Sequence, residues 1–182
     1  MTAFARGGLA KIILAVLLYF LFATKAWGAY VLPYPSYMPG HKFYRVSRVF
    51  DQIKNYWFWG NIAQFKYHMS LADKYLVEAK TLFEYGQYLL AVDGLKRSNQ
   101  HVQLLPTMLQ KAKKDGKDIV QLETILKESM REHSTVLQEL ETRLPREFTW
   151  QPEKEAPTAL PIAQLLREAR EEREKLQNIH VQ

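Results

Sequence analysis

Apolar side chains recur every three or four residues through the middle of the chain, and this spacing restricts the fold more than any other feature. Between positions 61 and 84 the intervals alternate between three and four, at Ile62, Phe65, Met69, Ala72, Leu76, Ala79 and Phe83. An α-helix has 3.6 residues per turn, so these positions share one face, and that face must be buried against neighbouring helices. The pattern therefore predicts helices packed side by side.

The same periodicity continues on both sides of this segment, with glycines at the breaks. Helices are predicted over 42–59, 61–85, 87–115 and 118–143, separated by Gly60, Gly86 and Gly116. Their expected inward-facing residues are Phe43, Val46, Phe50, Ile53 and Trp57, then Tyr88, Val92, Leu95, Val102 and Leu109, then Ile119, Leu122, Leu126, His133, Val136, Leu137 and Leu140. Such short connections place successive helices antiparallel, so we expect an all-α fold, an up-and-down bundle of about four helices over residues 42–144.

Three residues bear on the helix ends. Asn61 and Asp118 are candidate N-caps, because their side chains can accept a hydrogen bond from a free backbone N–H of the first turn. Pro106 falls inside the third predicted helix, where it removes a backbone donor and clashes with the preceding turn. We expect that helix to kink or restart at Pro106.

The first 28 residues have the pattern of a secretory signal. Arg6 and Lys11 precede an apolar run over 12–23, and small residues follow at Ala26 and Gly28. The uncharged stretch before Lys25 would reach about 20 Å as a helix, less than the ~30 Å hydrocarbon core of a bilayer. We expect residues 1–28 to be a signal peptide cleaved next to Gly28, with an uncleaved anchor from Ile12 to Leu32 as the alternative.

A proline-rich strap, residues 29–41, follows the signal. Pro33, Pro35 and Pro39 fix φ and disfavour the α conformation of the preceding residue, so the strap should be extended. Its aromatic side chains either pack on the bundle or form a recognition arm. The candidate interaction surface comprises Tyr34, Tyr37, Tyr44, Tyr56, Trp57 and Trp59.

The C-terminal part contains a proline-punctuated stretch and a last helix. Prolines 145, 152, 157 and 161 indicate a linker over 145–160. A charged amphipathic helix is expected over 161–182, with Leu165, Leu166, Ala169, Leu176 and Ile179 on its apolar face. This helix either docks on the bundle or frays, or it forms a coiled coil for self-association through 162–179.

Charge and composition exclude several classes of function. The chain lacks cysteine, which excludes disulfides, a thiol nucleophile and thiolate metal ligands. The net charge is +6, and the excess is concentrated in the front half, because residues 41–116 carry 12 basic and 6 acidic side chains. Acidic residues interrupt the basic ones, which argues against nucleic-acid binding and fits a weak attraction to anionic membrane or wall surfaces.

No pattern in the sequence predicts catalysis or a cofactor. The histidines, His41, His68, His101, His133 and His180, form neither a His-x-x-x-His nor a Glu-x-x-His motif, so no metal site is expected. Gly-x-Ser-x-Gly elbows and glycine-rich phosphate loops are also absent. We expect a protein that is not an enzyme, with His133 as a partnered residue at the edge of the core.

Part of the chain resembles a known family. The pattern Pro39-Gly40-His41-x-x-Tyr44-x-x-x-Arg48, then Ile53, then His68-x-x-x-Ala72-x-x-x-Leu76-x-Glu78-Ala79-x-x-Leu82 and Gly86, resembles a bacterial extracytoplasmic helical family of unknown function over residues 31–105. The resemblance implies a signal or anchor helix followed by paired long helices. A weaker resemblance, to a tetratricopeptide hairpin, rests on Ala79, Leu82, Gly86, Tyr88 and Ala91. No second copy follows at a ~34-residue period, as a solenoid requires.

These observations predict an exported helical protein of the cell envelope, periplasmic, extracellular or anchored outside the cytoplasmic membrane. It would act without catalysis as a structural, interaction or sensor-like module with a protein partner, touching the membrane only through an uncleaved signal. The alternatives are a periplasmic chaperone or stress adaptor, motivated by the basic front half and the exposed-aromatic candidates, and a hydrolase, which would need a pocket with perturbed titratable groups.

Overall fold

The computed structural model describes residues 30–33, 46, 49, 53, 58–154 and 156–178. Its long helices are α3 (Asn61–Glu84), α4 (Tyr88–Lys114), α5 (Val120–Arg143) and α6 (Ile162–Gln177). A small sheet of β1 (Phe148–Trp150) and β2 (Thr158–Leu160) lies between α5 and α6 in the sequence. The expected all-α bundle is confirmed.

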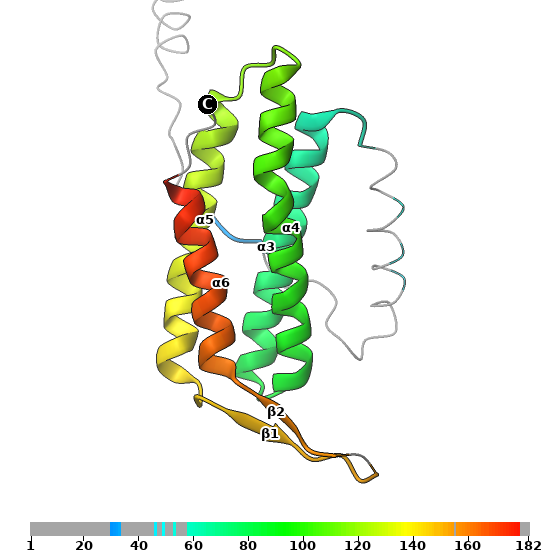
Figure 1. The fold of residues 1–182 in the computed structure, drawn as a ribbon, viewed down its shortest axis with the longest axis vertical. Helices are drawn as coiled ribbons and strands as arrows, with labels where there is room; N and C mark the ends of the chain where they lie inside the picture. Colours follow the sequence, from blue (N-terminus) through cyan, green and yellow to red (C-terminus); the bar gives the residue numbers. More distant parts are fainter. Residues whose placement is uncertain are drawn as a thin grey trace, which may run out of the picture.

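The four helices pack as two hairpins laid against each other (Figure 1). α3 packs along α4, α5 packs along α6, and the two pairs meet through contacts of α3 with α5 and of α4 with α6. The short connection at Gly116 reverses the chain, as expected, but the closest neighbours of α5 are α6 and α3, not α4.

The C-terminal helix is an integral member of this bundle. Ile162, Leu166, Ala169 and Leu176 of α6 are buried against the other helices. The segment predicted as the first bundle helix, 42–59, lies outside the described residues except for Val46, Val49, Ile53, Phe58 and Trp59. Val46 and Ile53, expected to face inward, are helical and about half exposed.

The helix ends follow the glycines, with two local differences. Gly60, Gly86 and Gly116 adopt positive φ values of 93°, 70° and 70°, which other residues rarely tolerate. Asp118 is not the N-cap of α5, which is Ile119; it lies one residue earlier and accepts a hydrogen bond from the Val120 N–H at 3.0 Å. Asn61 does not cap α3; its side-chain amide donates to Asp115 and so fastens the start of α3 to the end of α4.

Pro106 neither ends nor restarts α4, which runs unbroken from Tyr88 to Lys114. A proline inside a helix lacks the N–H that would bond the carbonyl four residues earlier. Val102, Leu105 and Leu109 around Pro106 are buried and keep the helix packed on its neighbours. Burial of that face therefore outweighs the local preference for a break.

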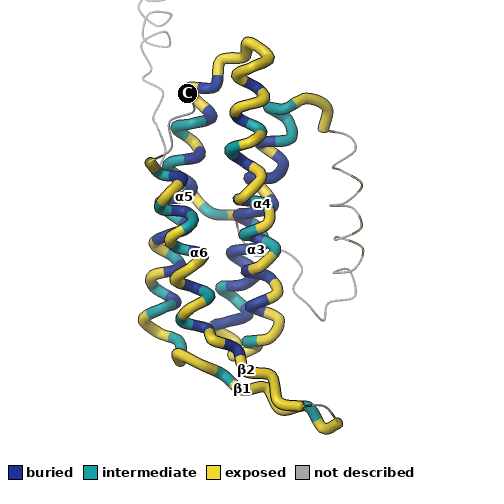
Figure 2. Tube along the Cα trace, viewed as in Figure 1, coloured by how far each residue is buried: buried dark blue, intermediate teal, exposed yellow. Residues whose placement is uncertain are grey.

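Buried positions run along the length of the helices (Figure 2). The apolar ones form two large clusters, one in each half of the bundle, and a small third cluster of Tyr67, Leu71 and Tyr75 on α3. The cluster near the α4–α5 connection contains Phe65, Met69, Ala72, Val102, Leu105, Leu109, Ala112, Ile119, Leu122, Leu126, Met130 and Leu176. The other large cluster contains Leu76, Ala79, Leu82, Phe83, Ala91, Val92, Leu95, Leu137, Leu140, Leu160, Ile162, Leu166 and Ala169. The inward faces predicted for 61–85, 87–115 and 118–143 are thus largely confirmed.

The stretch 145–160, expected as a linker, carries the two-stranded sheet. Its antiparallel register pairs Phe148 with Leu160 and Trp150 with Thr158. Phe148 lies over Tyr88 with ring centroids 4.6 Å apart, and Leu160 is buried in the apolar cluster that contains Leu76, Leu82 and Leu166. The hairpin therefore closes the end of the bundle where α3 meets α4.

Several sequence predictions fall on residues that the structure does not describe. The signal segment 1–28 is among them, as is the strap 29–41 except for residues 30–33. Within the part that is described, no helix is long and apolar enough to cross a membrane.

A close approach of α3 and α4 explains Gly94, which lies inside α4. A Cβ at this position would sit 3.4 Å from the Cα and Cβ of Ala79. We predict that Gly94→Leu lowers the free energy of unfolding by about 1–3 kcal/mol or more, because the helices must separate. Gly94→Ala should be near neutral, because a helix-propensity gain of up to ~1 kcal/mol offsets the tight contact. Urea denaturation of both variants measures this, and equal effects would contradict the close approach.

Candidate functional site

A layer of polar side chains crosses the bundle between the two apolar clusters. It contains Asp73 from α3, Ser98 and Asn99 from α4, Ser129 and His133 from α5, and Arg173 from α6. His133 and Arg173 are 0% exposed, and Asp73 is 6% exposed. Each helix thus places a polar residue at one level, where charge is costly unless it is paired.

The centre of the layer is a chain of hydrogen bonds through His133. Its Nε2 lies 2.8 Å from Oδ1 of Asp73, and its Nδ1 accepts a hydrogen bond of 3.2 Å from Nε of Arg173. A guanidinium can only donate, so Nδ1 must be unprotonated and the proton sits on Nε2, facing the carboxylate. The neutral imidazole therefore links a buried cation to a buried anion.

Further hydrogen bonds satisfy both charged groups. Arg173 donates through Nη1 to Asn99 Oδ1 at 2.8 Å and to the carbonyl of Ala169 at 2.9 Å, and through Nη2 to Ser98 Oγ at 2.8 Å. The hydroxyl of Ser98 in turn donates a hydrogen bond of 2.8 Å to the carbonyl of Ala72. Ser129 donates to Oδ1 of Asp73 at 3.3 Å. The network joins all four helices.

Tyr30, at the start of the described chain, completes the coordination of Asp73. Its hydroxyl donates to Oδ2 of Asp73, beside a pocket of about 240 Å³ that is lined by Tyr30, Phe65, Lys66, Met69, Ser70, Asp73, Leu122 and Ile125. Burial and then the negative charge of Asp73 raise the pKa of Tyr30, so the phenol keeps its proton. Asp73 consequently accepts from Tyr30, Ser129 and His133, a pattern that suits a carboxylate.

The layer holds its charge states firmly. Burial lowers the pKa of Arg173 to about 10, which still leaves the guanidinium charged at neutral pH. Burial is also the main cause that lowers the pKa of His133; the hydrogen bond to Asp73 opposes it, and the charge of Arg173 adds to it. Neither ring nitrogen of His133 remains available for proton transfer to a substrate.

A second pair of histidines lies between α3 and α4. Nδ1 of His68 is 2.9 Å from Nδ1 of His101, and the His101 ring stacks on Tyr75. Burial lowers the pKa of His68, which favours its neutral form, and the short distance requires one Nδ1 to donate and the other to accept. In the described ranges, no group of three or more histidine, aspartate or glutamate side chains is arranged to hold a metal ion.

Only one residue of the predicted interaction surface can be placed. Trp59 is 84% exposed and borders a pocket of about 440 Å³ lined by Phe58, Trp59, Gly60, Asn61, Ile62, Ala63, Lys66, Asp115 and Lys117. Tyr34, Tyr37, Tyr44, Tyr56 and Trp57 lie outside the described residues.

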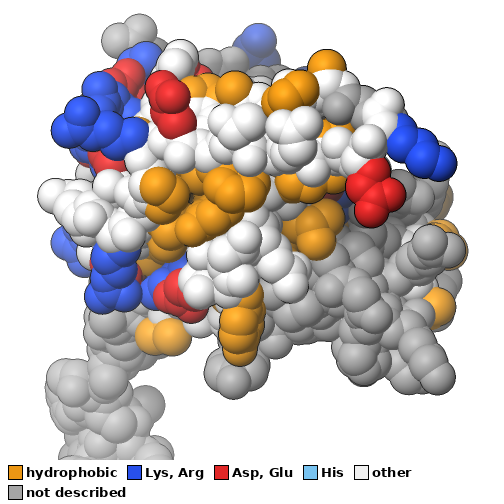
Figure 3. Space-filling view, turned by 90° about the horizontal axis from the view of Figure 1, so that it is seen from below, with side chains coloured by type: hydrophobic (Ala, Val, Ile, Leu, Met, Phe, Trp, Pro, Cys, Tyr) orange, Lys and Arg blue, Asp and Glu red, His pale blue; other side chains and the backbone are white. Residues whose placement is uncertain are grey.

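The end of the bundle that carries the β1–β2 hairpin, called the hairpin end below, exposes a different set of apolar side chains. Tyr85 is 75% exposed, and Leu89, Leu90 and Trp150 are each about 40% exposed. These residues come from the α3–α4 turn, the start of α4 and β1. Figure 3 looks onto this end and shows apolar side chains gathered in its middle with charged ones around them.

Sequence reasoning expected a partner for His133 but missed Asp73, Ser98 and Arg173. Arg173 occupies a stripe position of α6, because Leu166, Ala169, Arg173 and Leu176 are spaced three, four and three. Ser98 likewise lies three residues after Leu95 and four before Val102. A polar residue at the same step of several apolar stripes is the signal that could have revealed the layer.

The chain matches the family described as a domain of unknown function, DUF5667, over residues 36–181. The match includes α6, beyond the 31–105 range of the resemblance noted in the sequence. No curated protein and no solved structure matches the chain.

Because the layer contains two compensating charges linked by a neutral imidazole, removing one charged side chain should cost more than removing all three side chains of the chain of hydrogen bonds. We predict that Arg173→Met lowers the free energy of unfolding by about 3–5 kcal/mol, since it leaves Asp73 buried without its balancing charge. The triple variant Asp73→Leu, His133→Leu, Arg173→Met should cost less than this single change. Guanidinium denaturation compares them, and a triple variant at least as unstable as Arg173→Met would show that the charges are not coupled.

The lowered pKa of His133 also predicts a dependence of stability on pH. As pH falls below ~6.5, His133 binds a proton in the unfolded chain but not in the folded chain. Proton binding therefore stabilises the unfolded state relative to the folded state. The free energy of unfolding should therefore decrease with a slope of up to ~1.4 kcal/mol per pH unit from this one group, until the folded pKa is reached. His68 adds a contribution of the same sign. His133→Gln should flatten the slope between pH 7 and 5, and an unchanged slope would contradict the assignment.

Proposed function

The chain belongs to the DUF5667 family, a domain of unknown function, and we propose that it is an exported, non-catalytic module of the cell envelope. It binds a protein partner through the hairpin end, formed by Tyr85, Leu89, Leu90 and Trp150. The bundle serves as a rigid support for this surface. The observation that carries the proposal is the clustering of these exposed apolar side chains at one end of a bundle whose interior polar groups are paired with each other.

The hairpin end has the composition of a binding surface. Exposed apolar residues scattered singly need no explanation, but four from three segments at one end of the bundle form a patch. Tyrosine and tryptophan dominate binding energy in protein interfaces because each buries a large, rigid area at low entropic cost. Tyr85 lies in the turn, and Trp150 projects from a short strand, so neither needs to leave the core to reach a partner.

The surrounding contacts hold this surface in place. Phe148 packs on Tyr88, which is itself 6.4 Å from Phe83 between ring centroids. The Ala163 N–H donates to the carbonyl of Arg146 at 3.0 Å, which ties the base of the hairpin to the first turn of α6. A prearranged surface lowers the entropic cost of association.

Export rests on the N-terminal sequence. Two basic residues, an apolar run over 12–23 and the small residues Ala26 and Gly28 follow the order of a secretory signal. Mass analysis of native material tests this step separately: a mature N-terminus at or near Ala29 supports cleavage, and an intact Met1 supports an anchor.

Photo-crosslinking should locate the partner surface. With p-benzoylphenylalanine in place of Tyr85, we predict a discrete adduct in envelope fractions, because this side chain would lie inside the interface. The matched control places the same group at Val120, which is also exposed but lies at the α4–α5 end. Adducts at both positions, or at neither, would count against the hairpin end.

The same preparation distinguishes the chaperone alternative. A chaperone would suppress the aggregation of a reduced client at up to equimolar ratio. If the full chain does so, and Tyr85→Ser with Leu90→Ser has no effect on crosslinking or protection, the proposed partner surface is wrong.

A further inference from the structure

Four lysines gather at the α4–α5 end without an ion pair to any residue that the structure describes, whereas several charged side chains farther along the bundle are paired. Within the described ranges, Lys66, Lys111, Lys114 and Lys117 form no salt bridge. Elsewhere Lys80 pairs with Glu139 at 3.4 Å, Arg143 with Glu139 at 2.7 Å and Arg167 with Glu141 at 3.2 Å.

The nearby acidic residues are engaged in other contacts. Asp115 accepts from the side-chain amide of Asn61, and Asp118 accepts from the Val120 N–H. Asp115 therefore links the start of α3 to the end of α4, and Asp118 holds the turn before α5; neither forms a salt bridge with Lys66, Lys111, Lys114 or Lys117. Lysines in the last turn of α4 also stabilise the negative end of the helix dipole, but one or two positive charges are enough for that effect.

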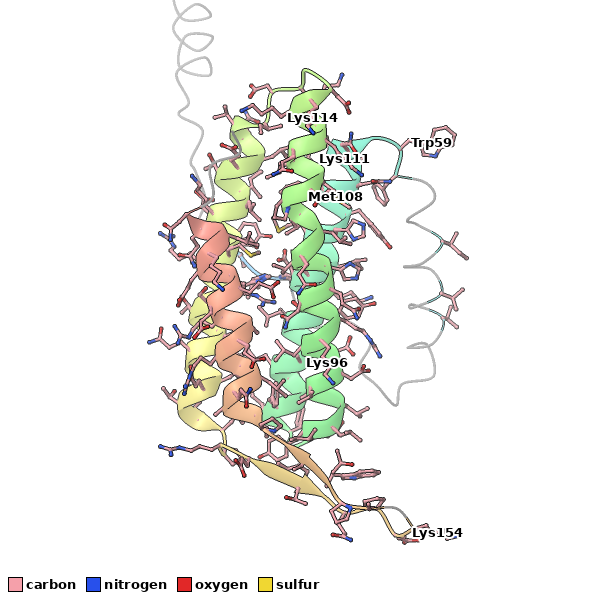
Figure 4. The ribbon with its side chains drawn as sticks, viewed as in Figure 1. Trp59, Lys96, Met108, Lys111, Lys114 and Lys154 are labelled. Atoms are coloured by element: carbon pink, nitrogen blue, oxygen red, sulfur yellow. The ribbon has the colours of Figure 1, made fainter. Side chains whose placement is uncertain are left out.

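The lysines share this end with an exposed tryptophan. Figure 4 shows Trp59 just before the start of α3, at the same end of the bundle as the last turns of α4, along which Met108, Lys111 and Lys114 follow one another. Lys66 and Lys117 line the pocket of about 440 Å³ under Trp59, together with the apolar Phe58, Ile62 and Ala63. Two lysines and one aspartate thus border a mainly apolar recess that Trp59 also lines.

We propose that this end of the bundle, the lysine–tryptophan end formed by Trp59, Lys66, Lys111, Lys114 and Lys117, docks on the surface of an anionic phospholipid bilayer. Flexible exposed lysines attract a diffuse layer of lipid phosphates without forming a built site for one anion. Tryptophan prefers the interface between headgroups and acyl chains. The recess accepts the glycerol and upper acyl region of a lipid.

The position of Tyr30 indicates the same orientation. Its pocket is lined by Phe65 and Met69, so Tyr30 lies on the half of α3 nearer the lysine–tryptophan end. Lys25 and Tyr30 are five residue steps apart, which span at most about 18 Å. Asn61 and Asp73 are separated along α3 by about 18 Å. While segment 12–23 remains in the bilayer, during export or as an anchor, this end lies within reach of the lipid surface.

Charge-matched double variants of the full chain test the proposal. Lys111→Gln with Lys114→Gln and Lys96→Gln with Lys154→Gln each remove two exposed positive charges, but Figure 4 places the second pair away from the lysine–tryptophan end. The measurement is the ratio of apparent Kd for phosphatidylcholine vesicles to that for vesicles with 30% phosphatidylglycerol. This ratio removes the contribution of the apolar segment 12–23, because that segment binds both kinds of vesicle.

The wild-type ratio should exceed one and collapse toward one at 0.5 M NaCl, because surface charges are screened. It should fall roughly tenfold in Lys111→Gln with Lys114→Gln and by less than twofold in the control pair. Equal losses in both pairs would reduce the effect to net charge and overturn the proposal. A wild-type ratio of one would also overturn it, as would a double-stranded DNA oligonucleotide that binds through the same lysines while vesicles do not. Failure here leaves the hairpin-end crosslink untouched, because the two surfaces lie at opposite ends of the bundle (Figure 1).

Discussion

The chain of hydrogen bonds from Asp73 through His133 to Arg173 is the constraint on which the rest of the bundle depends. Two opposite charges are buried without direct contact, and a neutral imidazole bridges them through one hydrogen bond to each. Desolvating each ion costs several kcal/mol, which only complete hydrogen bonding can offset. The helices must therefore align so that every donor and acceptor of the layer meets its partner.

This requirement gives the bundle a single register. Apolar stripes alone permit a helix to slide by one heptad, because leucines pack acceptably against many neighbours. A slide of that kind would place Arg173 in an apolar cluster and leave Asp73 unbalanced. The polar layer thus makes the alternatives expensive, which is the best-attested role of buried polar groups in helical assemblies. The close contact of Gly94 with Ala79 sets the distance between α3 and α4, and the polar layer sets how the helices are shifted along their axes.

The sequence predicted the local structure better than the assembly. The stripes of α3, α4 and α5, the turns at Gly86 and Gly116, and a partner for His133 follow from spacing and from glycine's conformational freedom. Spacing does not reveal which helix lies beside which, and so the membership of α6 was left open between docking, fraying and self-association. The strands in 145–160 were missed because each has only three residues and is held by Phe148 on Tyr88, a long-range contact. Pro106 shows the reverse case, in which a strong local signal is overridden by burial of the neighbouring side chains.

The contact between Tyr30 and Asp73 has a consequence for where the folding unit begins. The family match starts at residue 36, six positions after the tyrosine that supplies one of the three donors to the buried carboxylate. A fragment cut at the family boundary would keep all four helices and yet open the groove between α3 and α5, with water taking the place of the phenol. The packed structure of this chain therefore begins before the segment that the family model matches. Cleavage next to Gly28, as the sequence predicts, would leave Ala29 alone between the new N-terminus and a side chain that reaches the interior of the fold.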